Sequence, residues 1–101
     1  MKLWIDDVRR PVTNDYYWCK SVNEAKDVIK IWSELDDSLI ELIDIDHDAG
    51  DYANDGGDYI KLLDWLEETG RNYPIRIHSM NPVGAANMRR IIQRNGWTEV
   101  M

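Results

Sequence analysis

Short apolar segments alternate with amphipathic helical segments along this chain, and this alternation limits the folds open to it. Residues 3–5, 39–45 and 75–77 are apolar enough to form buried strands. The segments between and after them carry apolar residues at spacings of three and four, as helices do. Strands that alternate with helices favour a parallel sheet with helices on both faces. We therefore predict an α/β fold, a doubly wound domain of three layers.

Residues typical of helix ends bound three helices. Ser21-Val22-Asn23-Glu24 predicts a capping box at the start of the first helix. Gly70 is expected to end the second helix. Asn81-Pro82 predicts an N-cap followed by proline at the first position of the third, which would end at Asn95-Gly96. Their apolar faces comprise Val22, Ala25, Val28, Ile29 and Trp32 in the first, Tyr59, Leu62, Leu63 and Leu66 in the second, and Ala86, Ile91 and Ile92 in the third.

Two more strands complete the prediction. Residues 16–19 are aromatic and strand-like, and residues 97–101 are expected to form a last edge strand. Only about eight residues separate Asp7 from Tyr16, whereas a parallel crossover usually needs a dozen or more. Either the first connection is extended, with a degenerate first helix, or the second strand is antiparallel. We expect the extended crossover and hence a mostly parallel sheet of five strands.

Length and composition exclude several classes of protein. A chain of 101 residues predicts one domain over residues 1–101, and 44% hydrophobic residues exclude a disordered chain. No apolar run approaches the roughly 18 residues of a membrane span, no signal-peptide pattern follows Met1, and Cys19 has no partner for a disulfide. We therefore expect a cytoplasmic protein. The net charge of −7 and the lack of a basic stripe argue against binding of extended duplex nucleic acid, but leave a terminal phosphate or a small nucleotide possible.

Polar clusters follow three of the predicted strands. They are Asp6-Asp7-Val8-Arg9, Asp46-His47-Asp48-Ala49-Gly50 and His78-Ser79-Met80-Asn81-Pro82. Ligands of open α/β sheets bind in the crevice beyond the carboxyl ends of the strands. The three clusters are therefore expected to form one site.

The carboxylates of the clusters allow three interpretations. Asp6, Asp7, Asp46 and Asp48 are oxygen ligands of the kind that Mg²⁺ or another divalent cation prefers. Without a cation, crowding would raise some of their pKa values. Alternatively Asp46 accepts a phosphoryl group covalently, or all four merely form turns and caps.

Candidate phosphate-binding groups surround these carboxylates. Arg9 is suited to clamp a phosphate with two hydrogen bonds, or else pairs with Asp7 or Asp15. Ser79 is expected to hydrogen-bond a phosphate. The helix amides after Asn81, at Val83 and Gly84, form a potential anion site, with Gly84 allowing close approach, unless they are an ordinary capped helix start.

The sequence resembles a known family through these motifs. Asp6, Asp7, Asp46 and Ser79 match positions of two-component receiver domains, but no lysine occurs after Lys61 where a receiver needs one. The cyclic-phosphate-processing receiver domains are a closer match. They read D-D-x-R, D-H-D-x-G and H-S-x-N-P-x-G-x-x-N-M, and here only Ala49 departs from the expected leucine. The resemblance implies a receiver-like fold and an activity on cyclic phosphates.

The chemistry of that activity suits the two histidines, His47 and His78. Opening a cyclic phosphodiester needs a base, an acid and positive charge or donors on the phosphoryl oxygens, and histidine serves the first two tasks near neutral pH. The alternative is that each histidine only satisfies local backbone groups. We expect a metal-assisted phosphodiesterase or phosphatase acting on a 2′,3′-cyclic RNA end or a small nucleotide, with His47, His78 and Asp46 as catalytic residues. On this view His78→Ala would abolish turnover and leave stability unchanged.

Two alternatives come from other functional classes. One is a signalling receiver that is phosphorylated at Asp46. The other is a non-catalytic acidic protein that binds or inhibits a basic partner, as the net charge of −7 allows.

Overall fold

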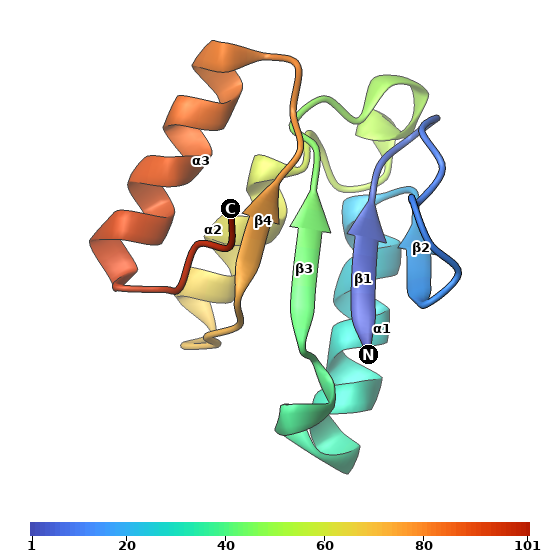
Figure 1. Ribbon diagram of the computed structural model, residues 1–101, viewed down its shortest axis with the longest axis vertical. Coiled ribbons are helices and arrows are strands. Elements are labelled where there is room, and N and C mark those ends of the chain that lie inside the picture. The colour runs from blue at the N-terminus through green and yellow to red at the C-terminus, as the bar shows by residue number, and fades with distance from the viewer.

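The computed structural model describes all 101 residues, and its strands form a single parallel sheet (Figure 1). The strands are β1 (Lys2–Ile5), β2 (Tyr16–Cys19), β3 (Leu42–Ile45) and β4 (Ile75–Ile77), in the order β2-β1-β3-β4. Because every pairing is parallel, all four carboxyl ends lie at one edge. We call this the carboxyl edge.

Two of the three helices, the first and the third, begin where the sequence predicts caps. The helices are α1 (Val22–Leu35), α2 (Ile60–Glu68) and α3 (Pro82–Asn95), with short 3-10 turns η1 (Asp37–Leu39) and η2 (Gly50–Asn54). Ser21 Oγ accepts a hydrogen bond from the amide of Glu24 at 3.0 Å, and Asn81 Oδ1 accepts one from Gly84 at 2.9 Å. Gly96 ends α3 with a φ of 66°, in the left-handed region that glycine adopts without strain. The predicted caps of α1 and α3 are confirmed.

All three helices pack on the same face of the sheet, so the predicted three layers are wrong. In Figure 1, α1 and α2 lie behind the strands and α3 packs beside α2. Right-handed crossovers explain this, because β2→β3 and β3→β4 run in the same direction across the sheet and place α1 and α2 on the same side. Only the connection from β1 to β2 runs the other way, and residues 6–15 contain no helix to cover the second face.

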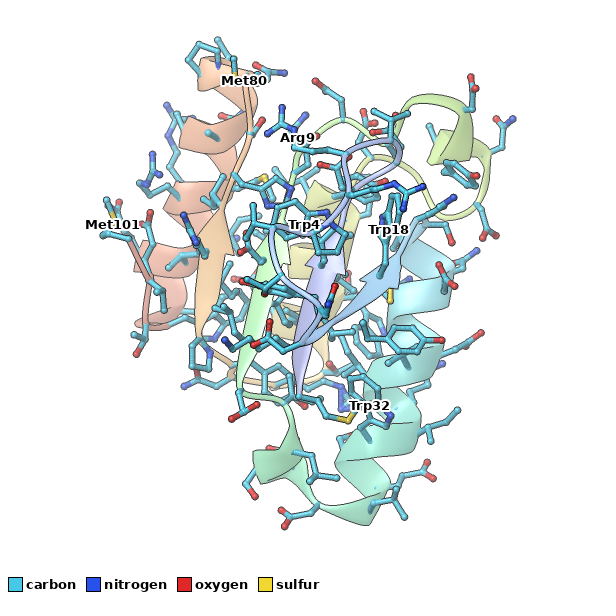
Figure 2. All side chains as sticks on the ribbon, turned by 45° about the vertical axis from the view of Figure 1, so that its right-hand side comes forward. Trp4, Arg9, Trp18, Trp32, Met80 and Met101 are labelled. Carbon is cyan, nitrogen blue, oxygen red and sulfur yellow. The ribbon has the colours of Figure 1, made fainter.

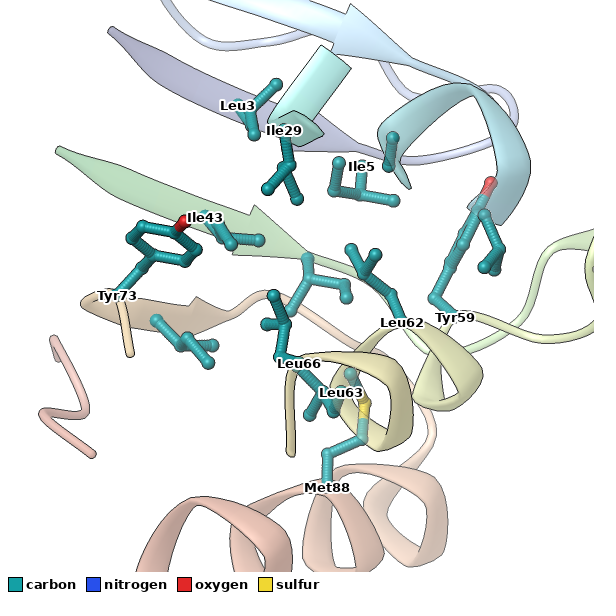
Figure 3. Packing of buried hydrophobic residues seen from close by; sticks show 14 of the residues in the cluster. Leu3, Ile5, Ile29, Ile43, Tyr59, Leu62, Leu63, Leu66, Tyr73 and Met88 are labelled. Carbon is teal, nitrogen blue, oxygen red and sulfur yellow. The ribbon is translucent and has the colours of Figure 1, made fainter. Parts of the chain in front are cut away.

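The hydrophobic core lies between the sheet and the helices (Figure 3). Leu3, Ile5, Ile43 and Ile45 point into it from alternate positions of β1 and β3, as the period of two in a strand requires. Val22, Ala25, Ile29, Leu62, Leu63, Leu66, Met88, Ile91 and Ile92 face them from the helices. The strand residues between, Trp4 and Asp44 among them, point to the opposite side, which we call the open face.

The second strand follows the prediction and the fifth does not. β2 pairs parallel with β1, from Lys2 with Tyr16 to Ile5 with Cys19, so the predicted parallel direction is confirmed. The degenerate first helix is not, because residues 6–15 contain no helix. Residues 97–101 form only an isolated bridge between Glu99 and Ile75. β4 is three residues long and offers little edge to pair with, and Arg89 Nε holds the Glu99 carboxylate at 2.8 and 3.0 Å. No helix combines the length and the apolar character needed to cross a membrane.

Candidate active site at the carboxyl edge

Three carboxylates meet at the carboxyl edge. Asp6 and Asp7 follow β1, and Asp46 follows the neighbouring strand β3. One potential ligand oxygen from each lies within 4.8 Å of the others. We call these three residues the acidic cluster. The fold therefore brings together three of the four carboxylates that the sequence singled out.

The first two carboxylates of the acidic cluster differ in their environments. Burial opposes ionisation of Asp6, but hydrogen bonds from the amide of Arg9, from His78 and from the amide of Val8 outweigh it and lower the pKa of Asp6. For Asp7, burial and the adjacent Asp6 carboxylate raise the pKa. Ionisation of Asp7 therefore costs more free energy than ionisation of an isolated carboxyl, and a nearby cation would offset this cost.

The loop after β3 closes directly over Asp7. A Cβ atom at Gly50 would lie 2.3 Å from Asp7 Oδ2, and Gly50 has a φ of 54°. Both the contact and the backbone conformation require glycine here. Gly50 thus lets η2 cover one side of the acidic cluster.

His78 lies on the open face and uses both ring nitrogens within the protein. Nδ1 lies 2.6 Å from Asp44 Oδ1, and Nε2 lies 3.0 Å from Asp6 Oδ2. The ring stacks on Trp4 with centroids 3.9 Å apart and an interplanar angle of 6°. Its side chain is only 10% exposed. Both ring nitrogens thus have protein partners, and neither is left free for the acid–base role that we predicted for His78.

His47 packs against the first turn of α3 instead. A Cβ atom at Gly84 would lie 2.4 Å from His47 Cγ. Nδ1 of His47 lies 2.8 Å from Asp48 Oδ1, and no protein group hydrogen-bonds Nε2. The two histidines therefore have different partners: His47 contacts α3 and Asp48, whereas His78 contacts Trp4, Asp44 and Asp6.

Asp48 belongs with His47 and not with the acidic cluster. His47, Asp48 and Asp58 form a second group with potential ligand atoms within 4.8 Å of one another. Asp58 Oδ1 also accepts a hydrogen bond from the amide of Ala49 at 3.0 Å. The structure thus groups Asp48 with His47 and Asp58, and not with the other three predicted carboxylates.

Most of the predicted phosphate-binding groups at α3 are already occupied. The amide of Gly84 donates to Asn81, and Ser79 Oγ accepts from the amide of Asn81 at 3.0 Å. His47 fills the space beside Gly84 that a phosphate was expected to use. Of the two amides predicted, only that of Val83 has no partner.

Arg9 keeps a free guanidinium group. It pairs with neither Asp7 nor Asp15, since Lys2 Nζ holds Asp15 at 2.9 Å. Figure 2 shows Arg9 near the carboxyl edge, above Trp4 in that view. Trp4 Nε1 donates to the carbonyl oxygen of Arg9 at 2.7 Å, which fixes the backbone of this residue and leaves its exposed side chain available.

Asp44 belongs to the site but is not among the residues that the sequence predicts for it. Asp44 lies within β3, is 0% exposed, and binds His78. The residues around it predict an apolar strand, which Asp44 interrupts. A charged residue in a strand buried on both sides is itself a signal, because such a charge needs a partner.

The fold and the acidic cluster define a receiver-like α/β domain. The chain belongs to the family of cyclic-phosphate processing receiver domains, whose family model matches residues 1–94. The comparisons with curated proteins and with solved structures give no match. The family that the motifs suggested is thus confirmed.

Proposed function

We propose that this domain is a metal-assisted phosphodiesterase or phosphatase that acts on a cyclic phosphate, either a 2′,3′-cyclic RNA end or a small nucleotide. The observation that carries the proposal is the acidic cluster, three carboxylates within 4.8 Å at the carboxyl edge of a domain from a cyclic-phosphate processing family. Ligands of such sheets bind at this edge.

The donor set fits Mg²⁺ or a similar hard cation. Mg²⁺ binds through one or two carboxylates, several waters and substrate phosphate. Asp7 and Asp46 would hold the ion directly. Asp6 would support it with the lone pair of Oδ2 that is not used by His78. Burial and the neighbouring Asp6 carboxylate raise the pKa of Asp7, and a bound cation would lower it again. When bound, the ion would neutralise charge on the phosphoryl oxygens.

His47 is the residue best placed to move a proton. Asp48 holds Nδ1, which leaves Nε2 to take a proton from water or give one to the leaving oxygen. Arg9, with its free guanidinium group, and the amide of Val83 would bind phosphoryl oxygens. In this assignment a single histidine serves as base and acid in turn.

Phosphorus NMR with a 2′,3′-cyclic nucleotide and with a short RNA ending in a 2′,3′-cyclic phosphate tests the proposal. We expect conversion to a monoester in Mg²⁺ and none in EDTA, with loss of turnover in Asp46→Asn and His47→Gln. Asp51→Asn changes an exposed carboxylate of η2 outside the cluster and should leave turnover intact.

Two results would contradict the proposal. Failure to convert either substrate in Mg²⁺ would exclude the activity, and equal turnover in EDTA would exclude the metal. A phosphoryl group transferred to the protein from a small phosphodonor, detected by intact mass and absent in Asp46→Asn, would favour the signalling receiver instead.

A further inference from the structure

The carboxylate of Asp44 has no part in the chemistry proposed above, yet it is fully buried. It lies on the open face, in register with Trp4 of β1 on one side and Arg76 of β4 on the other. Removing an ion from water costs several kcal/mol unless good partners compensate it. The contacts of Asp44 therefore indicate what this buried carboxylate does in the fold.

Three side chains compensate the charge of Asp44. His78 Nδ1 lies 2.6 Å from Oδ1, the hydroxyl of Tyr16 donates to Oδ2 at 3.0 Å, and Arg76 Nη1 lies 3.8 Å from Oδ2. Arg76 is half-exposed and is the most distant of the three. The short contact to His78 is thus the principal one.

His78 connects Asp44 to the acidic cluster. Its second nitrogen lies 3.0 Å from Asp6 Oδ2, so the imidazole bridges Asp44 and Asp6. The parallel stack on Trp4 fixes the plane of the ring.

Asp6 is then held at both oxygens. His78 binds Oδ2, while the amides of Val8 and Arg9 donate to Oδ1 at 3.1 and 2.9 Å. Without Asp44, the imidazole would be held at one nitrogen only and would be free to tilt along the face of Trp4. The orientation of Asp6 therefore depends on a residue that does not touch the acidic cluster.

We propose that Asp44 and His78 are positioning residues of the cation site: Asp44 fixes His78, and His78 fixes the carboxylate of Asp6 within the acidic cluster. This inference rests on the proposed function in so far as the cluster binds a divalent cation. Partners of metal ligands commonly set the orientation of those ligands, and their loss weakens metal binding by roughly 10-fold to 100-fold.

Titration with Mn²⁺ alone, followed by electron paramagnetic resonance, measures the effect without turnover. We expect Asp44→Leu and His78→Gln to weaken Mn²⁺ binding by roughly 10-fold to 100-fold. Asp44→Asn keeps an oxygen acceptor for Nδ1 and should lose less. Ile29→Ala opens a cavity in the core and costs stability without touching the bridge, so it should bind Mn²⁺ as the wild type does wherever it is folded.

Unchanged Mn²⁺ affinity in folded His78→Gln and Asp44→Leu would overturn the positioning role and leave the proposed function standing. If Asp44→Leu does not fold, Asp44→Asn and His78→Gln carry the comparison. A weakening in Ile29→Ala as large as in His78→Gln would also overturn the inference, because it would reflect stability alone.

A metal-free measurement separates this inference from the proposed function. The amides of Val8 and Arg9 report the position of Asp6 Oδ1. In the metal-free protein we expect His78→Gln and Asp44→Leu to shift their NMR resonances and to speed their hydrogen exchange. Unchanged amides would overturn the positioning role. Changed amides in a protein that binds no Mn²⁺ would uphold the positioning of Asp6 and reject the cation site.

Discussion

The absence of a side chain at Gly84 makes room for His47, the histidine that we assign to proton transfer. Gly84 is helical and has an ordinary negative φ, so backbone strain does not explain the glycine. The ring of His47 lies where a side chain at residue 84 would begin: a Cβ atom there would be 2.4 Å from Cγ of His47. A side chain of any other residue would push the imidazole off α3.

Gly84→Ala should therefore destabilise the domain, although alanine is the better helix former. The gain in helix propensity is about 0.5–1 kcal/mol, while overpacking against His47 costs about 1–3 kcal/mol. Urea unfolding should show a net loss of stability, and NMR should show a displaced His47 ring. Ala86 was predicted on the apolar face of this helix but is exposed in the structure, so Ala86→Gly should lose only the propensity and leave His47 in place. A more stable Gly84→Ala with His47 unmoved would contradict the packing argument.

Asp7 offers a second test at the residue scale. Burial and Asp6 raise its pKa, so Asp7→Asn removes an unfavourable charge and should stabilise the metal-free protein. The same change should cost Mg²⁺ affinity by roughly 10-fold or more. In the wild type, Mg²⁺ at 100 times its Kd should add about 2.7 kcal/mol of stability. Thermal unfolding with Mg²⁺ and with EDTA measures both effects, and an equal response of wild type and Asp7→Asn to Mg²⁺ would exclude Asp7 as a ligand.

At the scale of the elements, one residue couples the start of α1 to the loop that covers the acidic cluster. Ser21 is 3% exposed. Its hydroxyl accepts from Glu24 at the helix start and donates to Asp55 Oδ2 at 2.6 Å, just after η2. Asn23 Nδ2 also holds Asp55. The helix cap thus anchors the end of η2.

Ser21→Ala should lower the free energy of unfolding by about 1–2 kcal/mol, because a helix cap is lost and Asp55 loses a donor. Chemical denaturation measures the change. Ser33→Ala is the matched control in α1, because its hydroxyl donates to the carbonyl oxygen of Lys30 at 3.2 Å and caps no helix end. A cost in Ser21→Ala no larger than in Ser33→Ala would show that the cap does not stabilise the fold.

At the scale of the whole molecule, buried tyrosines limit stability at high pH. Burial and the hydrogen bond to Asp37 raise the pKa of Tyr73 from 10.0 to about 12. Burial also raises the pKa of Tyr59, whose hydroxyl donates to the carbonyl oxygen of Lys20 at 2.7 Å. A raised pKa in the folded state favours the protonated form, so this stability is complete below pH 10 and is lost as the pH rises toward 12.

We therefore expect the free energy of unfolding to fall between pH 10 and about 12, and tyrosinate absorbance to appear together with unfolding. Tyr73→Phe removes one of the two groups and should flatten the fall, although it loses the hydrogen bond to Asp37 at every pH. Circular dichroism and ultraviolet absorbance across this range make the measurement. A fall of the same steepness in Tyr73→Phe would show that Tyr73 does not control it.

The sequence by itself determined the local elements and the composition of the carboxyl edge. Capping residues such as Ser21 and Asn81 predicted the starts of α1 and α3, because a cap acts on amides within one turn. The parallel direction of β2 and the meeting of Asp6, Asp7 and Asp46 also followed from sequence, since parallel strands carry their last residues to one edge. The roles of these carboxylates stay a proposal.

Only the tertiary structure decided which way the side chains beyond the strands point. His78 turns to the open face because Asp44, Asp6 and Trp4 surround it there, and His47 turns to α3 because Gly84 leaves room. The helices gather on one face because their crossovers run in one direction, and the last strand is reduced to one bridge because β4 is short. These outcomes depend on contacts between residues far apart in the chain, which local patterns do not encode.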